Sequence, residues 1–147
     1  MNTQPDFEEL LKLLEQNSVR YMIIGGYAVA FHGFPRFTKD IDIFFSDSEQ
    51  NIAKIRKVLL DFGFTPENIP VEMFTEIGNI IQFGVTPVRV DLINDIDGVT
   101  YEDAEQHIIR GKYGDIEVNF IGKEDLLKNK KASGRPQDEL DVKMIEA

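Results

Sequence analysis

One short segment, residues 40–45, constrains the fold of this chain more than any other part of the sequence. It runs Asp-Ile-Asp-Ile-Phe-Phe, an alternation of acidic and apolar side chains that is typical of a β-strand with one buried face. The apolar face would hold Ile41, Ile43 and Phe45. Asp40 and Asp42 would point to the opposite face, close enough for both carboxylates to reach one cation. The fold must therefore bury one side of a sheet and leave paired acids on the other.

Helices are expected before, between and after the strands. Apolar residues recur at helical spacing in two segments, at Phe7, Leu10, Leu11 and Leu14 and again at Ile52, Ile55, Leu59 and Phe62. Further helices are expected at residues 27–31 and 101–109 and over most of the chain after residue 121. Strands are expected at residues 21–24, 40–45, 80–83, 88–93 and 116–121, with a tight turn at Thr86-Pro87. Because a tight turn joins antiparallel strands, the pattern predicts an α/β (α+β) domain, a mixed β-sheet flanked by helices.

The composition favours a single domain and excludes several classes of protein. The chain has 147 residues, 42% of them hydrophobic, and no cysteine. We therefore expect one domain over residues 1–147, without disulfides, thiolate zinc sites or cysteine nucleophiles, as fits a cytoplasmic location. No long apolar run is present and the N-terminus is polar and acidic, so neither a membrane span nor a signal peptide is expected. The net charge of -10 disfavours general DNA binding, although a nucleotide can bind where metal ions reverse the local sign.

A third acid, Asp91, lies in the expected strand at residues 88–93. The apolar side chains of Val88, Val90 and Leu92 share one face of that strand, which places Asp91 on the other. If this strand neighbours the one with Asp40 and Asp42, three carboxylates converge. Such hard oxygen ligands suit Mg²⁺ or Mn²⁺, and two such ions can clamp the attacking and leaving oxygens of a phosphoryl displacement. The alternative is that these are solvated acids on the outer face of a half-buried sheet.

Gly25-Gly26 follows an expected strand and precedes an expected helix. Glycine at such a place lets backbone N–H groups approach phosphate oxygens, and a helix N-terminus adds positive potential. The alternative is a plain tight turn.

These motifs together resemble a known signature. Gly-Gly-Tyr-Ala at residues 25–28, followed by Arg-Phe-Thr-Lys-Asp-Ile-Asp at residues 36–42, resembles the polymerase-beta-type nucleotidyltransferase superfamily. The form is similar to its small bacterial branch, which includes abortive-infection and toxin–antitoxin nucleotidyltransferases. Asn-Lys-Lys-Ala-Ser-Gly-Arg-Pro-Gln-Asp at residues 129–138, followed by Asp141, also resembles that branch. The resemblance runs from Gly25 almost to the C-terminus and implies the nucleotidyltransferase fold.

The resemblance also implies roles for individual residues. Gly25 and Gly26 would line the triphosphate of a nucleotide, and Arg36 and Thr38 belong to the same nucleotide-binding signature. The usual Gly-Ser of the superfamily is Gly-Gly here, so the chain lacks the serine hydroxyl that would contact a phosphate.

The acids would take the catalytic roles in the same resemblance. Asp40 and Asp42 would hold metal, and Asp91 would hold the catalytic metal and help to activate the acceptor hydroxyl.

The C-terminal segment is expected to complete the nucleotide site. Lys130 matches the family's lysine position and would offer its charge to the triphosphate. Arg135, between Gly134 and Pro136, would either pair with Asp138 and fix the turn or reach a phosphate. The alternative is a charged, solvated helix.

Two functions follow as hypotheses. The first is an enzyme that transfers a nucleoside monophosphate from a nucleoside triphosphate to a hydroxyl and releases pyrophosphate, with Mg²⁺ or Mn²⁺ as cofactor. The acceptor is left open among a small molecule, a tRNA end and a protein, and a partner protein or a second copy has room to complete the site. The second hypothesis is a non-catalytic interaction module of a toxin–antitoxin-type pair that keeps the fold.

Overall fold

A six-stranded mixed sheet forms the centre of the molecule, with strand order β3-β4-β2-β1-β6-β5. The computed structural model describes residues 4–34, 38–85 and 88–147. Neighbouring strands are parallel in the pairs β2–β4 and β1–β6 and antiparallel in the pairs β1–β2, β3–β4 and β5–β6. The mixed sheet expected from the sequence is thus confirmed. The strand bounds are β1 Tyr21–Ile24, β2 Asp40–Phe45, β3 Ile80–Val85, β4 Val88–Ile93, β5 Ile109–Tyr113 and β6 Ile116–Phe120.

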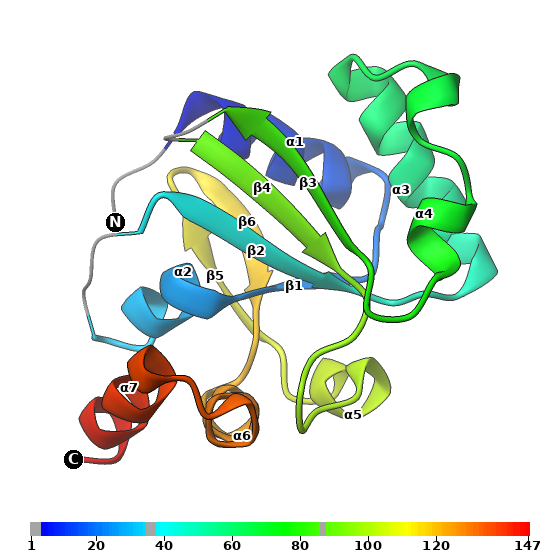
Figure 1. The fold of residues 1–147 in the computed structure, drawn as a ribbon. Helices are drawn as coiled ribbons and strands as arrows, with labels where there is room; N and C mark the ends of the chain where they lie inside the picture. The colour runs from blue at the N-terminus through cyan, green and yellow to red at the C-terminus, as the bar shows by residue number, and fades with distance from the viewer. Residues whose placement is uncertain (1–3, 35–37, 86–87) are drawn as a thin grey trace.

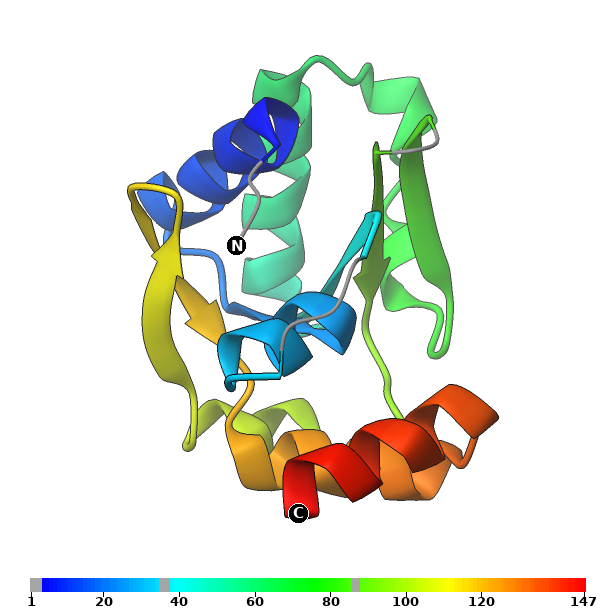
Figure 2. The same cartoon turned by 90° about the vertical axis from the view of Figure 1, so that its left-hand side faces the viewer.

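Helices cover both sides of this sheet (Figures 1 and 2). The first and third helices, α1 and α3, pack against each other on one side. Helix α2 lies on the other side against β1 and β2, and it contacts α6, which packs in turn on α7. The helix bounds are α1 Pro5–Gln16, α2 Gly25–Phe31, α3 Glu49–Phe62, α4 Glu72–Thr75, α5 Tyr101–Glu105, α6 Lys123–Ser133 and α7 Pro136–Glu146, with a 3-10 turn at Pro66–Asn68.

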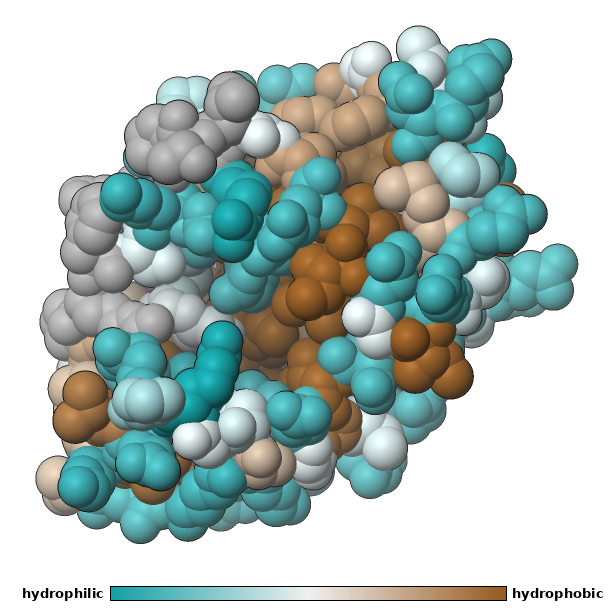
Figure 3. All heavy atoms as spheres, viewed as in Figure 1, coloured by the Kyte–Doolittle hydropathy of each residue, from teal (hydrophilic) through white to brown (hydrophobic). Residues whose placement is uncertain are grey.

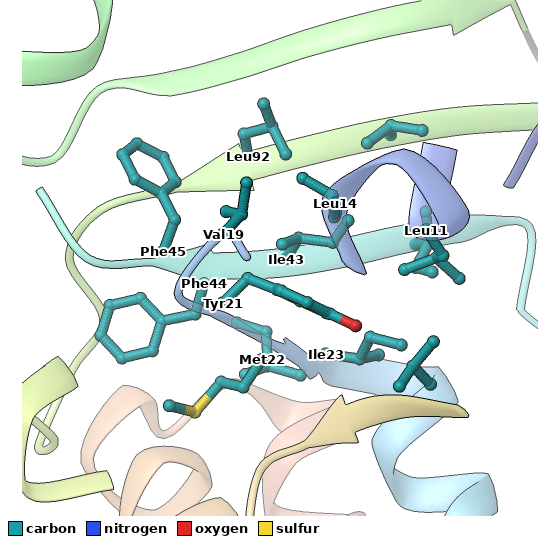
Figure 4. Packing of buried hydrophobic residues seen from close by; sticks show 14 of the residues in the cluster. Leu11, Leu14, Val19, Tyr21, Met22, Ile23, Ile43, Phe44, Phe45 and Leu92 are labelled. Atoms are coloured by element: carbon teal, nitrogen blue, oxygen red, sulfur yellow. The ribbon is translucent and has the colours of Figure 1, made fainter. Parts of the chain in front are cut away.

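The main core lies between α1, α3 and the sheet. The apolar stripe predicted for α1 is buried, with no member more than 2% exposed: Phe7, Leu10, Leu11 and Leu14. Figure 4 shows Leu11 and Leu14 beside Ile43 of β2 and Ile23 of β1. Ile41, Ile43 and Phe45 are likewise buried. The alternation in β2 therefore does what the sequence predicted, since the apolar face is held in the core and Asp40 and Asp42 are turned away from it.

Some expected boundaries were wrong. The helix expected over residues 101–109 ends at Glu105, and Ile109–Tyr113 forms the edge strand β5. β5 pairs with β6 across Gly114-Asp115, where Gly114 has a φ of 61° that glycine adopts readily. Residues Thr86 and Pro87, expected to form a turn, lie outside the described residues. Within the described part of the chain, no helix combines the length and apolar character needed to cross a membrane.

Candidate active site

The two acidic strands are parallel neighbours. In their register Asp42 of β2 lies opposite Asp91 of β4, and Asp40 lies opposite Arg89. Because both strands alternate in step, the four side chains project from one face of the sheet. Asp91 is buried, with 7% of its surface exposed, and a side-chain hydrogen bond joins it to Asp42. The contact between Asp42 and Asp91 therefore follows from strand pairing, and the sharing of one cation by all three acids stays a prediction.

Arg89 is the counter-ion of this acidic group. Its Nη2 lies 3.0 Å from Oδ2 of Asp40, and its Nε donates to Oδ1 of Asp91 at 3.1 Å. A third bond runs from Nη2 to Oδ2 of Asp91 at 3.3 Å. Among the described residues, no group of three or more acidic or histidine side chains is arranged so that it could hold a metal ion. The sequence analysis did not single out Arg89, although its position two residues before Asp91 on an alternating strand places it on the acidic face.

The pKa of Asp42 is raised to about 7. Burial of the carboxyl group is the largest cause, followed by the charge of Asp91, the hydrogen bond to it and the charge of Asp40, while Arg89 partly opposes the rise. Desolvation and like charges both disfavour the ionised form. The carboxyl group of Asp42 is therefore protonated to a larger extent than an ordinary aspartic acid as the pH approaches neutrality.

Gly25 and Gly26 begin helix α2 directly after β1, whose last residue, Ile24, lies opposite Asp42. Gly25 has a φ of +67°, and a Cβ added there would lie 2.3 Å from Oδ2 of Asp42. Only glycine tolerates both the left-handed backbone and this approach. No described side chain caps the first turn of α2. The glycine pair thus brings open backbone amides next to the acids.

Thr38 and Arg36 contribute differently. Thr38 lies just before β2, and its hydroxyl donates to the backbone oxygen of Asp40 at 3.2 Å, which ties it to the strand that carries two of the acids. Arg36 lies outside the described residues.

The C-terminal segment forms a buried ionic network. Nζ of Lys130 lies 3.2 Å from Oδ1 of Asp138 and 2.9 Å from Oδ2 of Asp141, and each of these three residues is at most 4% exposed. Ser133 also donates to Asp138, at 2.7 Å. The ammonium of Lys130 is therefore already neutralised by two carboxylates, and its expected contact with a triphosphate stays a prediction.

Arg135 joins this network from its outer side. Its Nε donates to Oδ2 of Asp138 at 2.8 Å, the pairing that the sequence offered as one of two possibilities, yet its side chain is 75% exposed. The pKa of Arg135 is raised, first by the hydrogen bond and the charge of Asp138, with a smaller contribution from Asp42. Arg135 is thus an accessible cation whose charge reaches the acidic site.

An apolar area adjoins the acids on the same face of the sheet. Two residues beyond Asp91, Ile93 of β4 lies opposite Ile80 of β3, and Ile80 is 49% exposed. Figure 3 shows this apolar area near the start of β3 and the end of β4, bordered by hydrophilic residues.

Comparison with known proteins agrees with this geometry. The family model described as "Nucleotidyltransferase of unknown function (DUF6036)" matches residues 6–146. The chain belongs to this family. The resemblance to nucleotidyltransferases read from the sequence is thereby confirmed.

Solved structures with the same fold include three nucleotidyltransferases. TM1012 from Thermotoga maritima, provisionally assigned as a nucleotidyltransferase, superposes with a TM-score of 0.63 at 14% identity, over 97% of this chain and 94% of that one. The lincosamide antibiotic adenylyltransferase LnuA, bound to lincomycin, superposes with a TM-score of 0.58 at 19% sequence identity, and the match covers 100% of this chain and 99% of LnuA. ANT(2'')-Ia in complex with adenylyl-2''-tobramycin superposes with a TM-score of 0.60 at 13% sequence identity, and the match covers 95% of this chain and 84% of that one. No curated protein matches this nucleotidyltransferase.

Proposed function

We propose that this nucleotidyltransferase moves a nucleoside monophosphate from a nucleoside triphosphate to a hydroxyl group, with Mg²⁺ or Mn²⁺ held by Asp40, Asp42 and Asp91. The observation that carries the proposal is the pairing of Asp42 with Asp91 on adjacent strands, where the pKa of Asp42 is raised to about 7. Such a rise marks a concentration of negative charge that a divalent cation would relieve.

The donor set fits a hard divalent cation. Mg²⁺ and Mn²⁺ prefer carboxylate, water and phosphate oxygens, and Asp40, Asp42 and Asp91 offer carboxylate oxygens on one face. When bound, the metal would neutralise charge that develops on the phosphate oxygens. Because Gly25 lies against Asp42, phosphates bound by the glycine amides would lie next to the acids.

The chain's own residues would bind and orient the reactants. Gly25 and Gly26 present backbone amides to phosphate oxygens, and Arg135 adds an accessible positive charge. Lys130 would act by holding the turn that carries Arg135, because its ammonium is bound to two buried acids. The acceptor oxygen forms a bond to the α-phosphorus while the bond to pyrophosphate breaks. Asp91 would accept the proton that leaves the acceptor hydroxyl.

A small organic molecule is the acceptor that this surface favours. The exposed apolar area at Ile80 lies along the sheet face from Asp91, where an acceptor must sit. The net charge of -10 repels the phosphates of nucleic acid. Two proteins of the same fold are named with small molecules bound, LnuA with lincomycin and ANT(2'')-Ia with adenylyl-2''-tobramycin.

The test is transfer of label from the α-phosphate of each nucleoside triphosphate, with Mg²⁺ and a small-molecule extract of cells. We expect a labelled small molecule and free pyrophosphate. The Asp42→Asn variant should lose transfer, and Asp61→Asn, which removes an exposed acid on α3, should keep it. If no fraction becomes labelled with any nucleotide while the protein is folded, a small-molecule acceptor is refuted; if RNA and protein fractions of the same cells also stay unlabelled, the chain is a non-catalytic module.

A further inference from the structure

Arg89 holds the place of a cation in the acidic group. Its guanidinium makes contacts of 3.0 to 3.3 Å with Asp40 and Asp91. These are two of the three carboxylates that the proposed function assigns to a metal. A guanidinium and a divalent cation compete for the space between the same two carboxylates, because two cations held there would repel each other.

We propose that Arg89 is a resident counter-ion that a divalent metal displaces, and that the displaced guanidinium then binds the triphosphate, so that nucleotide and metal bind cooperatively. The inference rests on the proposed function, because it needs the acids to bind metal. Arg89 is thus a positioning and nucleotide-binding residue that the known features of the site do not include.

The surroundings of Arg89 allow the displacement. Its side chain is 39% exposed, so the guanidinium can leave the acids for solvent without crossing the core. On the side away from Asp40, the residue opposite Arg89 is Gly84 of β3, which has no side chain to block the movement. The backbone of β4 is held on both sides by β2 and β3. Only the side chain of Arg89 needs to move.

The direction of the coupling follows from charge. Without nucleotide, a metal must compete with the guanidinium for Asp40 and Asp91, so Arg89 lowers metal affinity. When a triphosphate is present, the released guanidinium can bind its phosphate oxygens instead. Arginine binds phosphate favourably because its guanidinium can donate two parallel hydrogen bonds to one phosphate group. By linkage, the nucleotide must then raise metal affinity by the same factor that the metal raises nucleotide affinity.

Mn²⁺ binding measured by electron paramagnetic resonance tests the proposal. For Arg89→Gln we expect Mn²⁺ affinity without nucleotide to rise about 1.5-fold to fivefold, the change in affinity that corresponds to the loss of an exposed ionic contact. The increase in Mn²⁺ affinity caused by a non-hydrolysable triphosphate should be smaller than in the parent protein. The charge-matched control is Arg110→Gln on β5, whose guanidinium pairs with Glu15, and it should match the parent in both measurements.

Two further outcomes separate this proposal from the proposed function. Arg89→Lys keeps the charge but cannot reach both acids with two parallel donors, so its Mn²⁺ affinity should lie between those of the parent and Arg89→Gln. This variant also guards against a folding defect, which circular dichroism would reveal. Unchanged or weaker Mn²⁺ binding in folded Arg89→Gln would overturn the displacement while leaving the metal site in place. Absence of Mn²⁺ binding in the parent protein would overturn the metal site and the displacement with it.

Discussion

Replacement of Asp42 by asparagine should stabilise the metal-free protein at neutral and basic pH. The pKa of Asp42 is raised from 3.8 to about 7. Between about pH 4 and pH 7, Asp42 is therefore protonated in the folded state and ionised in the unfolded state. The free energy of unfolding of the parent protein therefore falls as pH rises through this window. A tenfold change in proton affinity corresponds to about 1.4 kcal/mol, which sets an upper bound of about 4 kcal/mol on the cost of ionising Asp42.

Asparagine has nearly the same shape and does not ionise. Its amide can donate to Asp91 in place of the shared proton, so the variant should avoid most of this fall. At pH 8 we expect Asp42→Asn to be more stable than the parent by about 2–4 kcal/mol. The difference stays below the upper bound because Asp42 and Asp91 titrate as a pair and because local rearrangement lowers the cost of ionising Asp42. Near pH 4 the two proteins should differ little.

Urea denaturation in a chelating buffer, from pH 4 to pH 8.5, measures this difference. The control is Asp61→Asn, which removes an exposed acid paired with Lys57 and should reproduce the pH profile of the parent. If Asp42→Asn followed the parent profile, or were less stable at pH 8, the raised pKa and the charge concentration inferred from it would be refuted.

Three other changes have defined outcomes. Asp138→Asn breaks a buried ionic network and should lower the free energy of unfolding by about 3–5 kcal/mol in urea denaturation; parental stability would contradict the role given to that network. Gly25→Ala should lower the melting temperature more than Gly33→Ala, because both have positive φ but only the Gly25 Cβ meets another group, Oδ2 of Asp42, at 2.3 Å, and equal losses would argue against this close approach. Arg135→Gln should weaken binding of a non-hydrolysable triphosphate about tenfold in calorimetry, as loss of a charge-assisted contact does, and unchanged affinity would return Arg135 to a purely structural role.

The sequence predicted the strands of this fold best where one face is buried and the other is charged. In β2 the alternation of Ile41 and Ile43 with Asp40 and Asp42 gives both the strand and its orientation. The edge strand β5 was missed because its residues Ile109–Tyr113 are mostly exposed and include Gly111, so no apolar alternation marks it.

The acidic part of the candidate site was easier to predict than its cations. Alternation placed Asp42 and Asp91 on the polar faces of their strands, and their approach was predicted on the condition that the two strands are neighbours. The partners of Lys130 depend on how α6 packs against α7, and this packing is set by the turn after Ser133 rather than by a periodic pattern. The bridging position of Arg89 depends on the pairing of β2 with β4, two strands that are far apart in the sequence.

The binding of a non-hydrolysable nucleoside triphosphate, titrated by calorimetry with and without Mg²⁺, tests the central claim most directly. We expect binding that requires Mg²⁺ and that is lost or greatly weakened in Asp91→Asn, because the carboxylates would hold the metal and the metal would hold the phosphates. Binding of equal strength without Mg²⁺, or full Mg²⁺-dependent binding by folded Asp91→Asn, would contradict it.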